Sequence, residues 1–439
     1  MRYEKYKESG VEWIGEVPSH WEVMKTSLAF NGIGSGTTPS TSKNEYYTEE
    51  DGLYWLQTGD LNDGEITDTS KKITLLAAHE CNLKFYPVDS VVIAMYGATI
   101  GKVGLLKIST STNQACCVLP KSKRCIPSFA FYLFLGAKKQ LLFDAMGGGQ
   151  PNISQDTIKK LKVSIPPQQE QRAIVSYLDE KCAKINGAIE VQKKKIDLLN
   201  ELKNTIITNA VIKGLNPDTP MKDSGVEWIG QVPEHWEVCK LKNHTKIILG
   251  KMLMSTPPKG EEHLYSLEKY LKSKNIGWLQ VIDDYDEVEE MWFNDYEKEL
   301  YHLEKYDLVM NEGGDVGKIG IWNNDSYDCY IQNSVNKITA DSYLNPFYLQ
   351  YLIFAIAKTN YFWSIVNPVS IAHLTKEKLS TTPILIPSIE EQELIVEHLD
   401  KKVSKIDTQI FKANYRIELL NELKQSIITE AVTGKVKVC

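Results

Sequence analysis

The chain has 439 residues and a formal net charge of −7, with 42% hydrophobic and 24% charged residues. This length suits two or three globular domains, and the net charge argues against a uniformly basic nucleic-acid binder. No apolar run reaches the roughly 18 residues of a membrane span, residues 1–7 are too polar for a secretory signal, and the eight cysteines show no zinc-site or disulfide spacing. We therefore expect a cytoplasmic protein.

The first predicted domain comprises residues 1–164. Apolar runs predict strands at residues 53–56, 91–95 and 102–106, and a longer apolar stretch predicts a helix at 127–143. The glycine-rich run 146–154 is predicted to be a loop. This segment is therefore expected to be a mixed α/β domain.

Two long helices are predicted, one at residues 165–214 and one at 386–439. Apolar residues recur at spacings of three and four along both, which is typical of a helix that packs along another helix. The stripe consists of Ile174, Leu178, Ile185, Ile189, Ile196, Leu199 and Ile206 in the first helix, and of Ile395, Leu399, Ile406, Ile410, Ile417, Leu420 and Ile427 in the second. Ser388 and Glu391 form a predicted capping box at the start of the second helix.

Between the two helices lie a linker, residues 215–236, and a second predicted domain, residues 237–385. Strands are expected at residues 309–310 and 318–322, and a helix is expected at 345–361. The chain order is therefore domain, helix, linker, domain, helix.

The chain is a tandem repeat. Residues 8–23 and 223–238 are identical at 13 of 16 positions, and residues 165–214 and 386–435 are identical at 24 of 50. Between these anchors the two copies diverge strongly. A shared frame around divergent segments is expected if the segments read different targets, and drift after an old duplication gives the same pattern.

The two helices are predicted to pair in antiparallel orientation. Each would be about 65 Å long at 1.5 Å per residue. Parallel pairing would require the linker to run almost fully extended along a whole helix, whereas antiparallel pairing needs no return path. The predicted fold class is α+β: two mixed α/β domains separated by an antiparallel coiled coil, with an internal pseudo-two-fold repeat.

Charge is segregated within the first repeat. Residues 22–99 carry 5 basic and 11 acidic residues, whereas residues 100–164 carry 10 basic and 2 acidic ones. The basic segment suits DNA phosphates, and the alternative is a solvated surface on a domain whose other half is acidic. Residues 237–385, with 15 basic and 21 acidic residues, are the weaker candidate for DNA binding.

No catalytic or metal site is predicted. The sequence lacks the Asn/Asp-Pro-Pro-aromatic motif of base methyltransferases and a phosphate-binding P-loop. The glycine strings at 101–104 and 317–320 are either strand turns or phosphate contacts through Lys102 and Lys318. The repeated motif contains His20, His235, Trp13, Trp21, Trp228 and Trp236. These residues are predicted to pack where each domain meets the helix pair, and partner binding is the alternative for the four tryptophans.

Several strings carry a family resemblance. They are the repeated EWIGEVPSHWEV and EWIGQVPEHWEV, the loop GTTPS at 36–40, the segments 55–61 and 97–104, and the run from QPNIS at 150–154 to Leu178-Asp179. In their order and duplication, they resemble the specificity subunit of type I restriction–modification systems over essentially the whole chain. The second repeat departs from this pattern at residues 249–251 and 367–371.

The resemblance implies a non-catalytic subunit that binds double-stranded DNA. Each divergent domain would read one half of a bipartite, asymmetric target, and the helix pair would fix the gap between the halves and dock two modification subunits. Those partners would methylate adenine with S-adenosylmethionine, and restriction subunits would use ATP and Mg²⁺, so this chain itself would bind no cofactor. The candidate DNA-binding residues are Gly36, Thr37, Thr38, Tyr96, Lys102, Lys138, Lys139, Gln150, Asn152, Lys251 and Lys318.

A function without DNA stays open from the residues alone. Two divergent domains on a coiled-coil rod would also suit a protein-interaction scaffold, which the acidic second domain favours. A self-contained restriction enzyme would need methyltransferase and nuclease motifs, which the sequence lacks.

Overall fold

The computed structural model describes residues 2–145, 152–313, 316–359, 361–366 and 373–438. It divides into two compact units. Unit 1 comprises residues 1–193 and 414–439, and unit 2 comprises residues 194–413. Each unit therefore contains one globular domain and part of each long helix, so the division cuts across both predicted helical segments.

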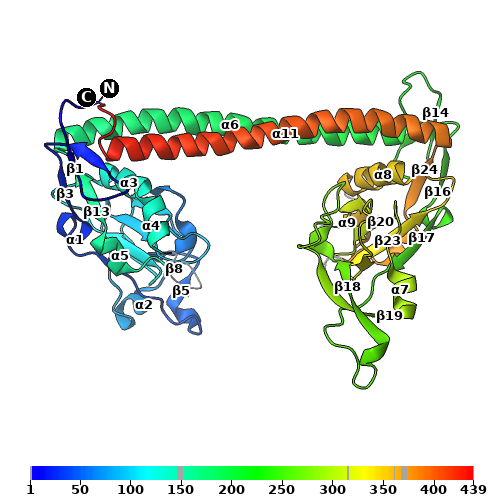
Figure 1. Cartoon of the computed structure of the whole chain (residues 1–439), viewed down its shortest axis with the longest axis horizontal. Coiled ribbons are helices and arrows are strands. Elements are labelled where there is room, and N and C mark those ends of the chain that lie inside the picture. Colours follow the sequence, from blue (N-terminus) through cyan, green and yellow to red (C-terminus); the bar gives the residue numbers. More distant parts are fainter. Residues whose placement is uncertain (1, 146–151, 314–315, 360, 367–372, 439) are drawn as a thin grey trace. The chain divides into compact units, whose positions relative to one another are not determined.

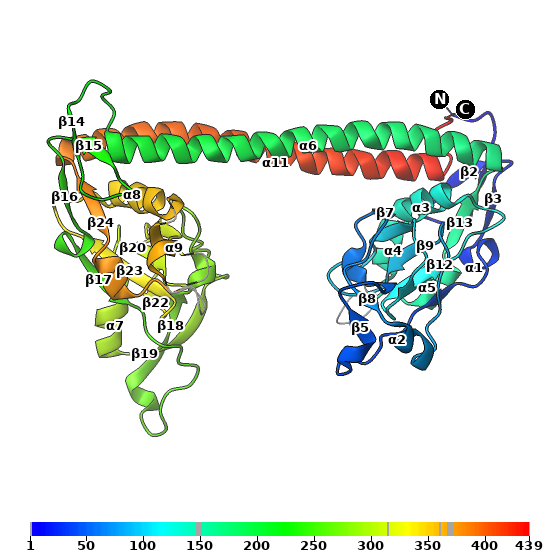
Figure 2. The same ribbon diagram turned by 180° about the vertical axis from the view of Figure 1, so that it is seen from behind.

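The long helices are α6 (Gln168–Lys213) and α11 (Ile389–Val432), and they lie side by side within each unit (Figures 1 and 2). In unit 1, the Ser164 hydroxyl, just before α6, donates to the Val432 carbonyl at 2.7 Å. Further along α6, Asn186 Oδ1 accepts from Lys424 Nζ at 2.9 Å. Rising residue numbers on α6 thus meet falling numbers on α11, and the pairing is antiparallel.

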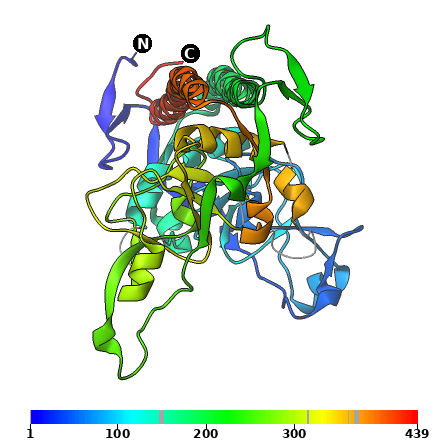
Figure 3. The same cartoon turned by 90° about the vertical axis from the view of Figure 1, so that its right-hand side faces the viewer.

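Unit 2 shows the same direction of pairing. Lys195 Nζ donates to Gln409 Oε1 at 3.4 Å, and Lys203 Nζ lies 2.8 Å from Asp407 Oδ1. Figure 3 shows the two helices end-on. The antiparallel coiled coil predicted from the sequence is confirmed within each unit.

The apolar stripe lies between the helices and against the globular domains. Its buried members are Ile174, Leu178, Ile185, Ile189, Ile395, Leu399 and Ile406, and its partly buried members are Ile196, Leu199, Ile206, Ile410, Ile417, Leu420 and Ile427. Near the carboxyl ends the fully buried side chains include Ile207 and Ile428, one residue beyond the predicted Ile206 and Ile427, together with Val211, Ala431 and Val432. The reason is that the globular domain also covers this end, as where Gln425 Nε2 donates to the Leu135 carbonyl at 2.8 Å.

The domain of unit 1 is built on two sheets. The five-stranded sheet has the order β4 (Gly34–Ser35), β12 (Cys116–Leu119), β9 (Val91–Ala94), β10 (Val103–Leu106) and β7 (Gly64–Ile66). The four-stranded sheet has the order β11 (Ser111–Thr112), β6 (Leu53–Leu56), β8 (Lys72–Ile73) and β5 (Tyr47–Thr48). Two-stranded ribbons pair β1 (Tyr6–Glu8) with β2 (Glu16–Pro18) and β3 (Glu22–Lys25) with β13 (Lys162–Ile165).

Short helices complete unit 1. They are α1 (Thr26–Ala29), α2 (Leu75–Glu80), α3 (Pro127–Gly136), α4 (Lys138–Asp144) and α5 (Gln155–Lys160), with 3-10 turns η1 (Asn44–Tyr46) and η2 (Thr58–Asp60). The single helix predicted at 127–143 is therefore two. It breaks where Gly136 packs so closely on α11 that a Cβ would lie 2.7 Å from Val432.

The domain of unit 2 has a related plan. One sheet has the order β17 (Thr245–Leu249), β23 (Val335–Ala340), β20 (Leu308–Asn311) and β21 (Ile319–Ile321), and the other has the order β19 (Glu289–Asn294), β18 (Tyr265–Leu271) and β22 (Tyr330–Ile331). The ribbons pair β14 (Met221–Asp223) with β15 (Gln231–Pro233) and β16 (Glu237–Lys240) with β24 (Pro383–Ile386). The helices are α7 (Asp295–Tyr301), α8 (Pro346–Lys358), α9 (Tyr361–Ile365) and α10 (Lys376–Ser380), with turns η3 (Leu241–Asn243), η4 (Glu262–Leu264) and η5 (Ser273–Asn275).

Helices α3 and α8 occupy equivalent places, each against the helix pair of its own unit (Figures 1 and 2). Tyr132 of α3 donates to Asp179 of α6, and Tyr351 of α8 donates to Asp400 of α11, both at 2.7 Å. Among the described residues, no helix is long and apolar enough to cross a bilayer. The predicted strands are all present, which confirms the mixed α/β character of both domains.

Candidate nucleic-acid interface

A repeated hydrogen-bonded cluster anchors each domain to the start of a long helix. In unit 1, Glu170 of α6 accepts hydrogen bonds from Trp21 Nε1 at 3.0 Å and from the Tyr3 hydroxyl at 2.9 Å, and His20 Nε2 lies 2.6 Å from its other oxygen. Partial burial acts to raise the pKa of the Glu170 carboxyl, but the hydrogen bonds from Trp21, His20 and Tyr3 outweigh it and hold the pKa below its usual range.

The second repeat builds the same cluster with Glu391 of α11. Trp236 Nε1 donates to Glu391 Oε2 at 3.0 Å, and His235 Nε2 lies 2.9 Å from the same oxygen. Trp21 and Trp236 are fully buried. The predicted packing role is confirmed for Trp21 and Trp236, whereas His20 and His235 are exposed and contact the glutamates from the surface. The predicted capping box is only half formed, since Ser388 accepts from the Glu391 amide at 3.3 Å while the Glu391 carboxylate binds Trp236.

The loop at residues 36–40 is fixed against the four-stranded sheet. Gly36 leaves no room for a side chain, because a Cβ would lie 1.7 Å from the Thr112 carbonyl oxygen. The Thr37 carbonyl accepts from Trp55 Nε1 at 3.2 Å, and the Thr38 hydroxyl donates to the side chain of Gln114. Thr37 remains exposed, so a rigid backbone presents it to solvent.

The glycine string at 101–104 forms the turn that leads into β10. Gly101 has a φ of +74°, which favours glycine, and Lys102 next to it is partly exposed. Lys138 is placed differently from the prediction: its ammonium lies 2.9 Å from Asp63 Oδ2, and both side chains are partly buried. Lys138 therefore serves a contact within the domain, while Lys139 beside it is exposed.

Tyr96 and Asn152 come together at the end of β9. The Ile153 amide donates to the Met95 carbonyl at 2.8 Å, which places Asn152 next to this strand end. Asn152 is exposed, and Tyr96 packs partly on the core. Gln150 lies outside the described residues.

Much of the basic charge of residues 100–164 is balanced by the acidic segment before it. Of its ten basic residues, five form ion pairs within the described part of the chain: Lys107, Lys121, Arg124, Lys138 and Lys160. Four of these five pair with acids of residues 22–99. Three of those four pairs are at the surface, where such pairs contribute about 0–1 kcal/mol, so DNA phosphates could replace the carboxylates.

The structure adds one candidate surface that the sequence reasoning missed. A polar hollow lies beside β5 and β8, lined by Thr41, Asn44, Tyr47, Thr48, Glu49, Asp68, Thr69, Ser70, Lys71 and Lys72. Lys71 and Lys72 lie over the rings of Tyr47 and Tyr54. Residues 22–99 have a net acidic charge, which argued against DNA binding there. The adjacent Lys71 and Lys72 and the hydroxyl-rich sequence around them could have indicated this surface.

In unit 2, Lys251 is not available to DNA. Its side chain is 6% exposed and forms an ion pair with Glu297 at 2.5 Å and a hydrogen bond to the Trp292 carbonyl at 2.7 Å. The ammonium also lies 5.0 Å from the centre of the Phe293 ring. The prediction of a DNA contact at Lys251 was wrong because the side chain points inward, where the partly buried Glu297 carboxylate receives its ammonium.

Lys318 lies in a hollow on the surface of unit 2. Gly317 before it has a φ of +93° and forms the turn into β21. The hollow is lined by polar and basic side chains that include Lys203, Lys274, Gln280, Lys318 and Gln350. Lys318 is thus placed as a turn residue with polar neighbours, which leaves both of its predicted roles open.

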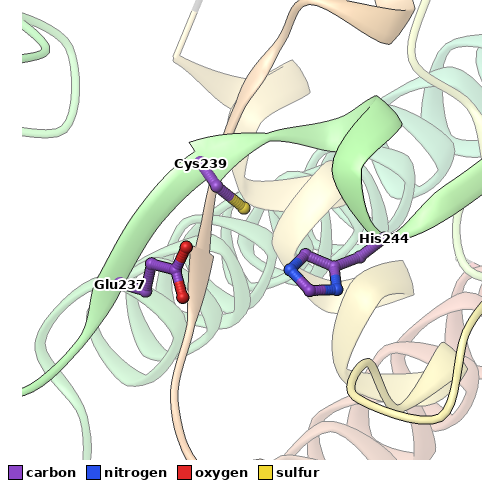
Figure 4. Close-up of side chains that lie close together, drawn as sticks. All are labelled: Glu237, Cys239 and His244. Atoms are coloured by element: carbon purple, nitrogen blue, oxygen red, sulfur yellow. The ribbon is translucent and has the colours of Figure 1, made fainter.

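A different constellation lies at the start of the second domain. The ligand-type atoms of Glu237, Cys239 and His244 lie within 4.8 Å of one another (Figure 4). Burial raises the pKa of the Cys239 thiol to about 11, with further contributions from the carboxylates of Glu237 and Asp341. Cysteine spacing gave no signal for this cluster, because its members are not arranged as a Cys-x-x-Cys pair.

The two units define a tandem-repeat protein with two mixed α/β domains, each anchored to an antiparallel helix pair by the same Trp–Glu contact. The family description "Type I restriction modification DNA specificity domain" matches residues 18–208 and 233–419. The chain therefore belongs to the type I restriction–modification DNA specificity family, and the predicted family is confirmed.

Known relatives match over nearly the whole chain. The type I restriction enzyme MjaVIII specificity subunit of Methanocaldococcus jannaschii is 25% identical over 96% of this chain and 94% of its own length. The EcoKI specificity subunit of Escherichia coli is 20% identical over 96% of this chain and 90% of its own length. A solved chain of a type I R-M system aligns with a TM-score of 0.67 and 17% identity, covering 96% of this chain and 99% of that one, so the fold is shared.

Proposed function

We propose that this chain is the DNA-recognition subunit of a type I restriction–modification complex, and that it directs methylation and restriction without catalysing either. The observation that carries the proposal is the duplicated frame. Two divergent domains are held by the same anchor, Trp21 on Glu170 and Trp236 on Glu391. Two dissimilar domains on one frame read dissimilar half-sites, so the target is bipartite and asymmetric.

Unit 1 offers the chemistry that DNA recognition requires. Backbone-fixed and exposed Thr37, partly exposed Lys102 and exposed Lys139 supply hydroxyl and ammonium donors for phosphates. Asn152 carries an amide that can pair with an adenine edge in the major groove. These side chains come from separate loops of one domain, which suits a surface that follows a groove.

The partners follow from the same assignment. They are double-stranded DNA, two modification subunits that methylate adenine with S-adenosylmethionine, and restriction subunits that use ATP and Mg²⁺, all acting in the cytoplasm. Exposed apolar side chains on the long helices support docking of partner subunits. In unit 1 they are Val191, Tyr415, Leu419 and Leu423, and in unit 2 they are Leu198, Leu202, Ile389, Leu394 and Phe411.

Mapping adenine methylation across the host genome, with and without this gene, tests the proposal. We expect an asymmetric, two-part sequence with a fixed internal gap to lose methylation when the gene is deleted. Re-expression of the wild-type chain should restore the same sequence. A continuous or palindromic target, or an unchanged methylation pattern, would contradict the proposal, and the unchanged pattern would favour the protein scaffold.

A further inference from the structure

The cluster at the start of the second domain joins residues from two parts of unit 2. Glu237 and Cys239 are two positions apart on β16, so their side chains lie on the same face of the strand. His244 follows η3, which folds the chain back toward that face. Figure 4 shows the imidazole ring of His244 directed toward Glu237 and Cys239.

The imidazole ring of His244 is held by a carboxylate behind it. Its Nδ1 atom lies 3.0 Å from Asp341 Oδ2, and the Asp341 amide donates to the His244 carbonyl at 3.0 Å. The ring also packs against Tyr343, with 6.1 Å between the ring centres. Because Nδ1 is bound to Asp341, Nε2 remains as the ligand atom. A carboxylate behind a histidine is the usual outer partner of a metal-binding imidazole.

The donor set identifies the kind of ion. Thiolate, imidazole and carboxylate are the three protein ligands of Zn²⁺, whereas Mg²⁺ and Ca²⁺ prefer oxygen alone. Neighbouring ligand atoms of a tetrahedral Zn²⁺ lie roughly 3.3–3.7 Å apart given bond lengths of about 2.0–2.3 Å. The ligand atoms are within 4.8 Å of one another here, so small side-chain rotations complete the geometry.

The geometry points to a Zn²⁺ site formed by Glu237, Cys239 and His244, with Asp341 positioning the histidine. The first repeat has no counterpart, because its equivalent residues at an offset of 215 are Glu22, Met24 and Ala29. The ion would connect β16 and η3 at the start of the second domain. Asp341, which follows β23, would link them to that strand through its contact with His244. The site therefore belongs to unit 2 alone, in a segment that differs between the repeats.

Titration of the full chain with Co²⁺, followed by displacement with Zn²⁺, tests the site. We expect one Co²⁺ per chain with the near-ultraviolet absorption of a Co²⁺–thiolate bond and the visible bands of tetrahedral geometry. Zn²⁺ should remove both. Cys239→Ser should abolish the thiolate band and weaken Zn²⁺ binding at least about tenfold. His244→Gln should weaken Zn²⁺ binding by a similar factor.

Two further variants separate the site from a general effect of thiols or of folding. Cys81→Ser removes another partly exposed cysteine and should change neither the band nor the affinity. Asp341→Asn should weaken Zn²⁺ binding by about 10–100-fold and keep the thiolate band, because the ligands remain. A wild-type chain without the thiolate band, or equal Zn²⁺ binding by wild type and a Cys239→Ser variant with unchanged circular dichroism, would overturn the proposal.

Discussion

One carboxylate fixes each globular domain to its long helix. Glu170 receives donors from Tyr3 and Trp21 and contacts His20, so its charge is used by three side chains that belong to the domain. Hydrogen bonds to an ionised partner are stronger than neutral ones, and a buried indole N–H left without an acceptor is costly. The anchor therefore contributes to stability through its ionised form.

Replacing Glu170 with Gln should destabilise unit 1 by about 1–2 kcal/mol at pH 7. The pKa of the Glu170 carboxyl is lower in the folded protein than its usual value of 4.5. Ionised Glu170 therefore stabilises the fold fully at pH values above 4.5, and this stabilisation is lost as the pH falls through the pKa of the folded state. The difference between wild type and Glu170→Gln should therefore shrink below about pH 4, as measured by urea unfolding at several pH values.

The control for this substitution is Glu180→Gln, which changes an exposed glutamate on the same helix that pairs with Lys184. It should leave the unfolding midpoint nearly unchanged. A difference between Glu170→Gln and wild type that stays constant from pH 7 to pH 3 would contradict the role of the ionised carboxylate.

Lys102→Ala should weaken DNA binding by the assembled complex and reduce its dependence on salt. Each phosphate contact adds about 0.9 to the slope of log K against log salt, so removing one should lower the slope by about that amount. Binding assays from 50 to 200 mM salt measure this slope. Lys107→Ala is the matched control. Lys102 comes just before β10 and Lys107 just after it, but the Lys107 ammonium is paired with Glu65 at 3.0 Å. Equal slopes for wild type and Lys102→Ala would rule out the phosphate contact.

Side-chain roles were only partly predictable from the sequence. The repeated Trp motif could be assigned to packing because duplication marked both copies. The inward position of Lys251 could not be predicted, because its partner Glu297 is 46 residues away. The same reason hid the contact between His244 and Asp341, which lie 97 residues apart.

At the scale of elements, the long helices carry the most predictable part of the fold. Their periodicity gave both their existence and their buried stripe, because one face repeats over the whole of α6 and α11. It did not show that the carboxyl end of α11 also meets α3 and that of α6 also meets α8, contacts that widen the buried face to include Ile428 and Ile207. A second burial surface is not visible in the pattern of a single helix.

Inserting four residues into both helices, near Gln192 and Ala413, should lengthen the gap in the recognised DNA sequence. Four residues add about 6 Å and roughly one turn, so the apolar stripe keeps its direction, and the gap should grow by about two base pairs. Methylation mapping of the variant would measure the gap. Insertion into α6 alone should disrupt the pairing and abolish recognition. An unchanged gap after the double insertion would refute the spacing role.

At the scale of the whole molecule, exposed apolar side chains indicate surfaces that partners cover. Phe411 of α11 is 71% exposed, which is unusual for a large aromatic side chain and indicates a surface that a partner covers. Phe411→Ser should reduce co-purification with the modification subunits at least about tenfold, since a central aromatic anchor is typically worth 2 kcal/mol or more. Pull-down with the co-expressed modification subunit would measure it.

Phe143→Ser is the control, because Phe143 is 73% exposed but lies on α4, away from the helix pair in sequence. It should leave co-purification unchanged. Equal capture of the modification subunit by wild type, Phe411→Ser and Phe143→Ser would show that Phe411 lies outside the docking surface.

The architecture as a whole was predictable because the chain repeats its plan, while the charge distribution was not. Two copies of the same frame required two domains and two helices. The basic excess of residues 100–164 is partly neutralised in the fold, because four of its ten basic residues pair with acids of residues 22–99. Net charge along a sequence does not reveal which carboxylates its lysines will meet.

Each unit borrows part of a helix from the other repeat. Unit 1 is completed by residues 414–439 of the second copy, and unit 2 contains residues 194–213 of the first. This is the arrangement that two identical half-length chains would form by exchanging helix ends in a symmetric homodimer. Fusion of two such genes would keep the exchanged helix ends and free each domain to diverge. The exchanged helices thus record how a symmetric reader of identical half-sites could become a reader of different ones.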